Sequence, residues 1–179
     1  PLQWLKLISK NRGTVSVAPP FGYELCQRRV NEKDLAELDL SCWRVAGIGA
    51  EPISAEQLHQ FAECFRQVNF DDKTFMPCYG LAENVCLATF ASQDYRVLKL
   101  DYEAYQKNRA IVLDEVPEGT QVKEIVSVGK PVKDLTVVIG NPKTKKVYSD
   151  LHIGEIFISG DSVANGYWGN LKENANFRV

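Results

Sequence analysis

Hydrophobic and polar residues recur in two periods along the first half of the chain. Apolar residues at helical spacing in 2–9 predict a first helix, and a second helical stripe consists of Leu58, Phe61, Ala62 and Phe65. Between them, short apolar runs at 14–18 and 43–49, followed by another at 73–79, predict strands. A further helix is expected over 21–30, after the Pro19-Pro20 pair.

Helices and strands are therefore expected to alternate through the first half. Such alternation predicts an α/β fold of parallel βαβ units. Ser54 precedes the second apolar stripe, with Gln57 three residues later, which is a signature of a helix start. Ligands of open α/β sheets bind beyond the carboxyl ends of the strands, so the loops at those ends are the first candidates for a site.

The second half has shorter periodic segments. The runs "EIVSVG", "LTVVIG" and "GEIFISG" alternate apolar and polar residues and are separated by turn-forming residues. This pattern predicts antiparallel hairpins that form a side sheet or barrel. The sequence is thus divided into an α/β half at 1–92, an insertion-like segment at 93–122 and a β-rich part at 123–179.

Composition and charge narrow the function classes. The 179 residues are 45% hydrophobic and 25% charged, with a net charge of −2, which is typical of a globular domain. The basic run "KTKK" is interpreted as a solvated turn, so nucleic acid is not an expected partner. No apolar run reaches the ~20 residues of a membrane span. Five cysteines without C-x-x-C spacing favour a reducing compartment, and hence the cytoplasm, over a zinc site.

The stretch "YGLAE", Tyr79 to Glu83, follows the third predicted strand. Gly80 would permit a turn and a close ligand, and a following helix would direct free N–H groups at an anion. Tyr79 offers a flat face to a purine, and Glu83 is an oxygen ligand of the kind that Mg²⁺ takes together with phosphate oxygens. The alternative is a plain strand–turn–helix joint in which Glu83 only favours the helix N-terminus. The residue types alone leave both interpretations open.

A second loop, "GAEP", comprises Gly49, Ala50, Glu51 and Pro52 and follows the second predicted strand. Because both strands are expected to be parallel, both loops should lie at the same edge of the sheet. The backbone of this loop could line an adenine pocket. It could equally be an ordinary turn, with Glu51 as a charge flanking the next helix.

The segment "GEIFISGDSVANGYWG" near the C-terminal end predicts a strand, a glycine turn and a short helix. Asp161 or Ser162 is expected to cap that helix. Tyr167 and Trp168 are expected to be anchors of the core, as large aromatic side chains usually are. No order of residues suggests a Ser-His-Asp or Cys-His arrangement, and no catalytic residue is assigned.

These motifs, in this order, resemble those of the adenylate-forming superfamily of acyl and aryl ligases. "CYGLAE" is similar to that family's adenine and magnesium motif, "GAEP" to its adenine-lining loop, and "GEIFISGDSVANGYW" to its later strand–turn motif. The stretches "ISKNRGTVSVAPPFGYELCQRRV" and "LDLSCWRVAGIGAEPI" look most like fatty acyl-AMP ligases. The segment from about Asp94 to Val122 sits where those ligases carry an insertion that disfavours coenzyme A.

The resemblance implies roles for particular residues and cofactors. It implies part of the N-terminal domain of an enzyme that uses ATP and Mg²⁺, with Glu83 as the magnesium ligand and with a nucleotide site made by Gly49, Ala50, Glu51, Pro52, Tyr79, Gly80, Leu81 and Ala82. Ala82 stands where many relatives have a threonine that touches phosphate, so only its backbone would make that contact. The walls of an acyl tunnel would be Val17, Phe21, Gly22 and Tyr23.

The implied reaction forms acyl-AMP from a fatty acid and ATP, and then transfers the acyl group to the phosphopantetheine thiol of an acyl carrier protein. The family's phosphate loop would precede Pro1, and its ribose-binding Asp and the lysine of its C-terminal domain would follow Val179. We therefore expect these 179 residues alone to be inactive. An acyl- or aryl-CoA ligase, or a ligase-like domain that binds without catalysis, stays open as an alternative.

Overall fold

The computed structural model describes residues 1–92, 95–170 and 172–177. They divide into two compact units. Unit 1 comprises Pro1–Cys78, Ala91–Val97 and Ile125–Gly129, and unit 2 comprises Tyr79–Phe90, Leu98–Glu124 and Lys130–Val179. Two residues of the insertion-like segment, Gln93 and Asp94, lie outside the described residues.

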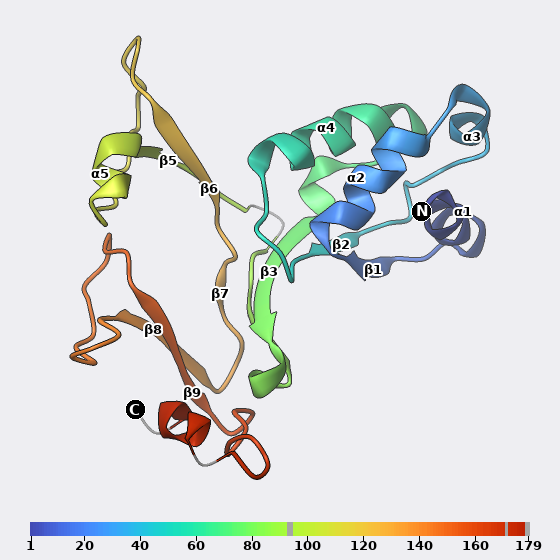
Figure 1. Cartoon of the computed structure of the whole chain (residues 1–179). Coiled ribbons are helices and arrows are strands. Elements are labelled where there is room, and N and C mark those ends of the chain that lie inside the picture. Colours follow the sequence, from blue (N-terminus) through green and yellow to red (C-terminus); the bar gives the residue numbers. More distant parts are fainter. Residues whose placement is uncertain (93–94, 171, 178–179) are drawn as a thin grey trace. The chain divides into compact units, whose positions relative to one another are not determined.

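Unit 1 is an α/β unit in which helices α2 and α4 lie side by side over the strands (Figure 1). Its elements are α1 (Leu2–Asn11), β1 (Val15–Ala18), α2 (Pro20–Arg29), α3 (Glu32–Ala36), β2 (Val45–Ile48), α4 (Ala55–Phe65), the 3₁₀ turns η1 (Arg66–Val68) and η2 (Asp72–Thr74), and most of β3 (Phe75–Leu81).

The three strands of unit 1 are parallel, as the alternation of helices and strands predicts. β1 pairs with β2 from Val15↔Val45 to Ala18↔Ile48, and β2 pairs with β3 up to Ile48↔Pro77. The carboxyl ends of β2 and β3 therefore lie at one edge of this sheet. The loop from Gly49 to Pro52 follows β2 directly, whereas Tyr79, Gly80 and Leu81 are the last three residues of β3 itself.

The core of unit 1 is built largely from aromatic side chains. All four residues of the predicted α4 stripe are buried, and the ring centroid of Phe61 lies 5.0 Å from that of Tyr23 and 4.5 Å from that of Phe65. Helix α4 begins as predicted, because the Ser54 hydroxyl accepts a hydrogen bond from the Gln57 amide. Helix α2 starts at Pro20, where the missing N–H costs nothing.

Unit 2 consists of short strands and turns. Its elements are η3 (Ala82–Asn84), β4 (Cys86–Phe90), most of β5 (Val97–Asp101), α5 (Tyr102–Gln106), most of β6 (Val122–Val126), β7 (Lys130–Pro131), β8 (Leu135–Gly140), β9 (Glu155–Gly160) and η4 (Glu173–Phe177). The predicted antiparallel pairing is confirmed for β8 and β9, which run from Leu135↔Gly160 to Gly140↔Glu155. β4 and β7 are antiparallel as well.

Two local predictions near the C-terminal end are wrong. No helix follows β9 within residues 161–170, so neither Asp161 nor Ser162 caps one, and the Ser162 hydroxyl instead donates to Asn84 at 2.7 Å. Tyr167 and Trp168 are not core anchors, because Tyr167 is 45% exposed and Trp168 is fully exposed. The loop that carries them makes hydrogen bonds to a turn rather than entering an apolar core.

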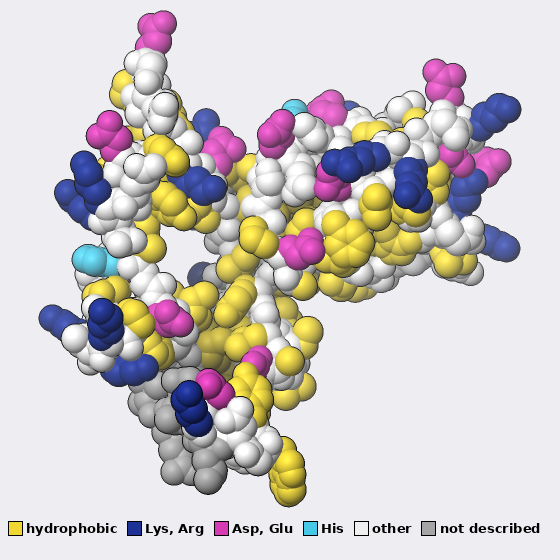
Figure 2. Space-filling model, in the orientation of Figure 1, with side chains coloured by type: hydrophobic (Ala, Val, Ile, Leu, Met, Phe, Trp, Pro, Cys, Tyr) yellow, Lys and Arg dark blue, Asp and Glu magenta, His cyan; other side chains and the backbone are white. Residues whose placement is uncertain are grey.

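On the face drawn in Figure 2, acidic and basic side chains are interspersed. The ion pairs of the protein include the partly buried Lys6 with Asp34 at 3.0 Å and the exposed Arg12 with Asp39 at 2.6 Å. Pairs near the surface contribute little to stability, because water and salt screen their charges. Within the described residues, no helix is long and apolar enough to cross a membrane.

Candidate functional site

The loop after β2 is shaped by a close approach of two backbones. A Cβ at Gly49 would lie 2.5 Å from the Cys78 carbonyl oxygen, so only glycine fits there. The next residue, Ala50, has a φ of 69°, in the left-handed region that is unfavourable for alanine. Gly49 is buried, whereas Ala50, Glu51 and Pro52 are exposed. The loop thus presents its last three residues to solvent at the end of the strand.

The stretch Tyr79 to Glu83 differs from the predicted strand–turn–helix. Tyr79, Gly80 and Leu81 still belong to β3, and the only helical part is the three-residue turn η3. Val85 and Cys86 then have φ values of 52° and 85°, which reverse the chain into β4. A helix N-terminus that could bind an anion does not form at this position, because β4 begins only three residues after Glu83.

Gly80 has a different role from the predicted turn. A Cβ at Gly80 would lie 1.6 Å from the carbonyl oxygen of Cys86 and 3.1 Å from the Cα of Leu87. The glycine is therefore required where β3 passes the backbone at the start of β4. This contact fixes the position of Tyr79 and Leu81 on either side of it.

Tyr79 and Glu83 both line a groove of about 990 Å³ within unit 2. The hairpin of β8 and β9 supplies apolar side chains to this groove, among them Val138, Ile156 and Phe157. Leu81 and Tyr167 line it as well. The groove also has polar lining residues, among them Thr136, Lys145 and Glu155, so it offers both an apolar wall and hydrogen-bonding groups to a small molecule.

Glu83 is half-buried in this groove and is held by a residue far away in sequence. The Tyr167 hydroxyl donates a hydrogen bond to Glu83 Oε1. This bond, followed by one from the residue's own backbone N–H, lowers the pKa of Glu83, and the same bond raises the pKa of Tyr167. Glu83 is therefore an ionised carboxylate, which is the form that a hard cation requires.

The side chains around Glu83 suit a metal ion that takes most of its ligands from groups other than protein side chains. Among the described residues, no group of three or more His, Cys, Asp or Glu side chains could hold a metal ion. Glu83 is one of three glutamates that line the groove, together with Glu155 and Glu173, and Lys145 lines it as well. The ionised carboxylate of Glu83 fits Mg²⁺, which is usually bound by one or two carboxylates together with phosphates and water.

The four predicted tunnel residues lie in unit 1. Val17 and Phe21 are 62% and 52% exposed. Gly22 is in α2, where a Cβ would meet only the Ala18 Cβ, at 3.4 Å. Tyr23 is buried in the aromatic core, which raises its pKa, and its hydroxyl donates to the Gly47 carbonyl at 2.8 Å. Their role as tunnel walls stays a prediction.

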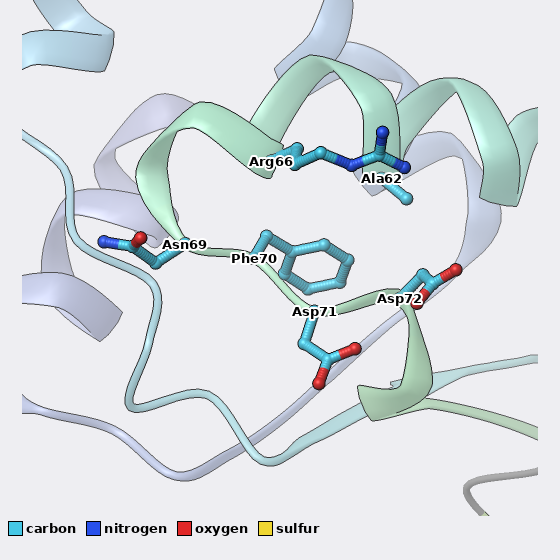
Figure 3. A pocket seen from close by; sticks show the side chains of 6 residues that line it. All are labelled: Ala62, Arg66, Asn69, Phe70, Asp71 and Asp72. Carbon is cyan, nitrogen blue, oxygen red and sulfur yellow. The ribbon is translucent and has the colours of Figure 1, made fainter.

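A smaller hollow of about 370 Å³ in unit 1 contains none of the predicted site residues. Figure 3 shows the Phe70 ring between the Arg66 side chain and the Asp71 carboxylate. Phe70 is 5% exposed and belongs to the core, while Asp71 accepts a hydrogen bond from the Lys73 amide and so caps η2. These residues have structural roles that account for their positions.

Comparison with known proteins assigns the chain to a family. Residues 1–168 match the AMP-binding enzyme family, and the chain belongs to it. It is 39% identical over 97% of its length to the medium-chain-fatty-acid–[acyl-carrier-protein] ligase JamA of Moorena producens. It is 35% identical over its full length to the 4-hydroxyphenylalkanoate adenylyltransferase of Mycobacterium tuberculosis. It spans 30% and 29% of the length of these two relatives.

Solved structures agree with this assignment. A structure from a study of fatty acyl-adenylate ligases of E. coli and L. pneumophila is 57% identical and has a TM-score of 0.92, covering 99% of this chain and 32% of that one. A fatty acyl-adenylate ligase of L. pneumophila, solved with acyl adenylate and pyrophosphate, is 37% identical with a TM-score of 0.89, covering 97% and 30%. The predicted resemblance to fatty acyl-AMP ligases and the predicted α/β fold are confirmed.

Sequence reasoning missed the partners of the Ala82–Asn84 turn. Tyr167 and Ser162 both belong to a motif that was singled out in the sequence. Tyr167 bonds to Glu83, which lies 84 residues away, and Ser162 bonds to Asn84, which lies 78 residues away. A single sequence carries no signal for such a long-range pair.

Proposed function

We propose that this chain is the adenine and magnesium side of a ligase that activates a fatty acid with ATP. In the first step a carboxylate oxygen of the acid attacks the α-phosphorus of ATP, and the bond to pyrophosphate breaks. In the second step a phosphopantetheine thiol of an acyl carrier protein attacks the acyl carbonyl and releases AMP. This acceptor is supported by JamA and by TtuA of Teredinibacter turnerae, which is 34% identical over 95% of this chain. Both relatives are named as medium-chain-fatty-acid–[acyl-carrier-protein] ligases.

The observation that carries the proposal is the ionised Glu83 in the same groove as Tyr79. Tyr79 would stack on the adenine ring, an interaction of about 0.5–1.5 kcal/mol. Glu83 would hold a magnesium ion, which would neutralise charge on the phosphates. Gly80, Leu81 and Ala82 would border the nucleotide through their backbone. Gly49, Ala50, Glu51 and Pro52 would contribute to binding it from their own loop.

A second candidate acceptor is coenzyme A. A putative acyl-CoA synthetase of Caulobacter vibrioides is 34% identical over 98% of this chain, which covers 31% of that protein. The two candidates differ only in the thiol that attacks acyl-AMP, so one experiment separates them.

The test uses the full-length protein with ATP, Mg²⁺ and a series of fatty acids, with coenzyme A and holo-carrier protein offered in parallel. We expect acyl-AMP by mass spectrometry and thioester on the carrier alone. Glu83→Gln should lower the rate of acyl-AMP formation by at least about 100-fold, because one negative ligand is lost. Thioester on coenzyme A would favour the second candidate. The absence of acyl-AMP with every acid would contradict both.

A further inference from the structure

The turn that carries Glu83 is tied to the loop of residues 161–168, here named the Tyr167 loop, by three hydrogen bonds. Ser162 donates to the Asn84 side chain at 2.7 Å, and the Ala164 amide donates to the Glu83 carbonyl at 2.7 Å. The Tyr167 hydroxyl donates to the Glu83 carboxylate. The first two bonds hold Asn84 and the backbone of the turn, and only the third reaches the group that a cation would contact.

We propose that Tyr167 is a positioning residue for Glu83, whose hydroxyl orients the carboxylate in the groove for a magnesium ion that arrives with the nucleotide. The proposal rests on the proposed function, because it assumes that Glu83 is the metal ligand. The hydrogen bond engages Oε1, and a carboxylate has two oxygens with about four acceptor sites. One donated bond therefore fixes its orientation and still leaves room for a cation.

Tyr167 is itself held in place although it is 45% exposed. Its amide donates to Asn174 Oδ1 at 2.6 Å, and Asn174 Nδ2 donates back to its carbonyl at 3.1 Å. The Phe177 ring meets the Tyr167 ring edge-on at 5.1 Å. Gly166, with a φ of 141°, makes this possible, because a Cβ there would lie 2.6 Å from the Asn174 side chain. The phenol is therefore a supported donor rather than a free surface side chain.

Groups that hydrogen-bond to a metal ligand fix its orientation, and their loss typically weakens metal binding by about 10–100-fold. A purely structural bond would instead affect the fold of the turn without changing metal affinity. The two roles can thus be separated by measuring metal binding directly. The positioning role predicts weaker metal binding when the Tyr167 hydroxyl is removed, whereas the purely structural role predicts unchanged metal binding.

The experiment titrates Mn²⁺, as a paramagnetic substitute for Mg²⁺, into the full-length protein with a non-hydrolysable ATP analogue, and follows free Mn²⁺ by electron paramagnetic resonance. Tyr167→Phe should raise the dissociation constant of Mn²⁺ about tenfold. The affinity for the analogue without metal should stay within about twofold. In turnover, the Mg²⁺ requirement should rise while the KM for the fatty acid stays unchanged.

Three further variants serve as controls. Tyr148→Phe removes another phenol of unit 2, which accepts a hydrogen bond from Asn141 at 2.9 Å, and should leave Mn²⁺ affinity unchanged. Tyr167→Phe added to Glu83→Gln should cause no further loss, because the hydroxyl acts through the carboxylate. Asn174→Ala, which releases Tyr167 without touching Glu83, should weaken Mn²⁺ in the same direction by a smaller factor.

Wild-type affinity in Tyr167→Phe would overturn the proposal, and so would tighter binding, since the hydroxyl would then compete with the metal. Should Tyr167→Phe fail to fold, Asn174→Ala decides in its place, and unchanged affinity there would overturn the proposal. If Glu83→Gln itself binds Mn²⁺ like the wild type, the metal site of the proposed function is wrong. A loss in Glu83→Gln without one in Tyr167→Phe refutes positioning alone.

Discussion

The two units bury different kinds of side chain. Most of the largest fully buried residues among those described belong to unit 1, including Trp43, Phe61, Phe65 and Phe75. The member from unit 2 is Asn84, a polar residue that is 2% exposed. Its amide donates to the Leu87 carbonyl and its oxygen accepts from Ser162. Unit 1 is thus stabilised by apolar burial, whereas the groove of unit 2 depends on hydrogen bonds between turns.

This difference explains where binding residues can be placed. A packed aromatic core tolerates little change, since its rings fill space at near-crystalline density. Turns that are joined by hydrogen bonds can present a charged group such as Glu83 without burying it fully. We therefore expect substitutions in unit 1 to change mainly stability, and those of Glu83 and Tyr167 in unit 2 to change mainly binding.

The largest expected effect on stability comes from removing the central ring of unit 1. Phe61→Ala should lower the free energy of unfolding by about 3–5 kcal/mol, because a fully buried ring in contact with five other aromatic residues leaves a cavity. Hydrogen exchange of α4 measures the loss. The control Phe21→Ala, at a half-exposed position, should cost less than about 0.5 kcal/mol. Equal losses in both variants would contradict the aromatic core.

Gly80 of unit 2 is expected to tolerate substitution as poorly as the core residues of unit 1, and Gly80→Ala tests this. The added methyl group would collide with the Cys86 carbonyl, which belongs to the backbone and cannot rotate away. We expect a loss of about 3 kcal/mol, measured by thermal unfolding and by hydrogen exchange of β4. Gly22→Ala is the matched control, because its methyl group meets only ordinary contact in a helix and should stabilise by up to about 1 kcal/mol.

A smaller, pH-dependent effect is expected at the surface of unit 1. Asp39 accepts hydrogen bonds from the Ser41 amide and hydroxyl, from Arg12 and from Asn69, and the Ser41 bonds contribute most to holding its pKa below the usual range. A lowered pKa stabilises the fold above the unfolded value of about 4 and ceases to do so as the pH falls through the folded value.

Asp39→Asn should therefore flatten the acid side of a plot of melting temperature against pH. The largest change in slope is expected below about pH 4. The exposed Glu118→Gln change in unit 2 should keep the wild-type slope. If Asp39→Asn parallels the wild type at every pH, the Asp39 network contributes nothing to stability.

The smallest expected effect concerns the polar contact of unit 2. Ser162→Ala removes the donor to buried Asn84 and should cost about 1 kcal/mol. Faster hydrogen exchange in residues 82–88 would report it, while Mn²⁺ affinity should change less than in Tyr167→Phe. Ser149→Ala, an exposed serine beside His152, is the control and should leave that exchange unchanged. An unchanged rate in Ser162→Ala would show that Asn84 is held by its bond to Leu87 alone.

Much of the fold can be predicted from the sequence because it depends on local periodicity. The α4 stripe, the three parallel strands and the β8–β9 hairpin all follow from the spacing of apolar residues. The short helix α3 was not predicted, since its five residues carry no periodic pattern and depend on the Asn31 cap. Element boundaries shifted by one or two residues, as strand ends are set by neighbouring strands.

The site could be predicted only in part. The glycine and the glutamate in residues 79–83 predicted a candidate site there, but the geometry of the turn depends on the contact between Gly80 and Cys86. The placement of Tyr167 on Glu83 depends on tertiary structure that brings together residues 84 apart. The aromatic ring of Tyr167 favoured the prediction of a core position, but its hydroxyl bonds to Glu83 at a position that is 45% exposed.

The cysteine side chains of the chain differ in accessibility, which allows selective labelling. Burial raises the pKa of Cys26 to about 11 and also raises that of Cys64, while Cys42 is buried. Cys86 is exposed and lies two residues beyond Asn84, which lines the groove. A maleimide fluorophore should therefore label this chain first at Cys86. If the groove binds the nucleotide as proposed, the emission of this fluorophore should change when the nucleotide binds.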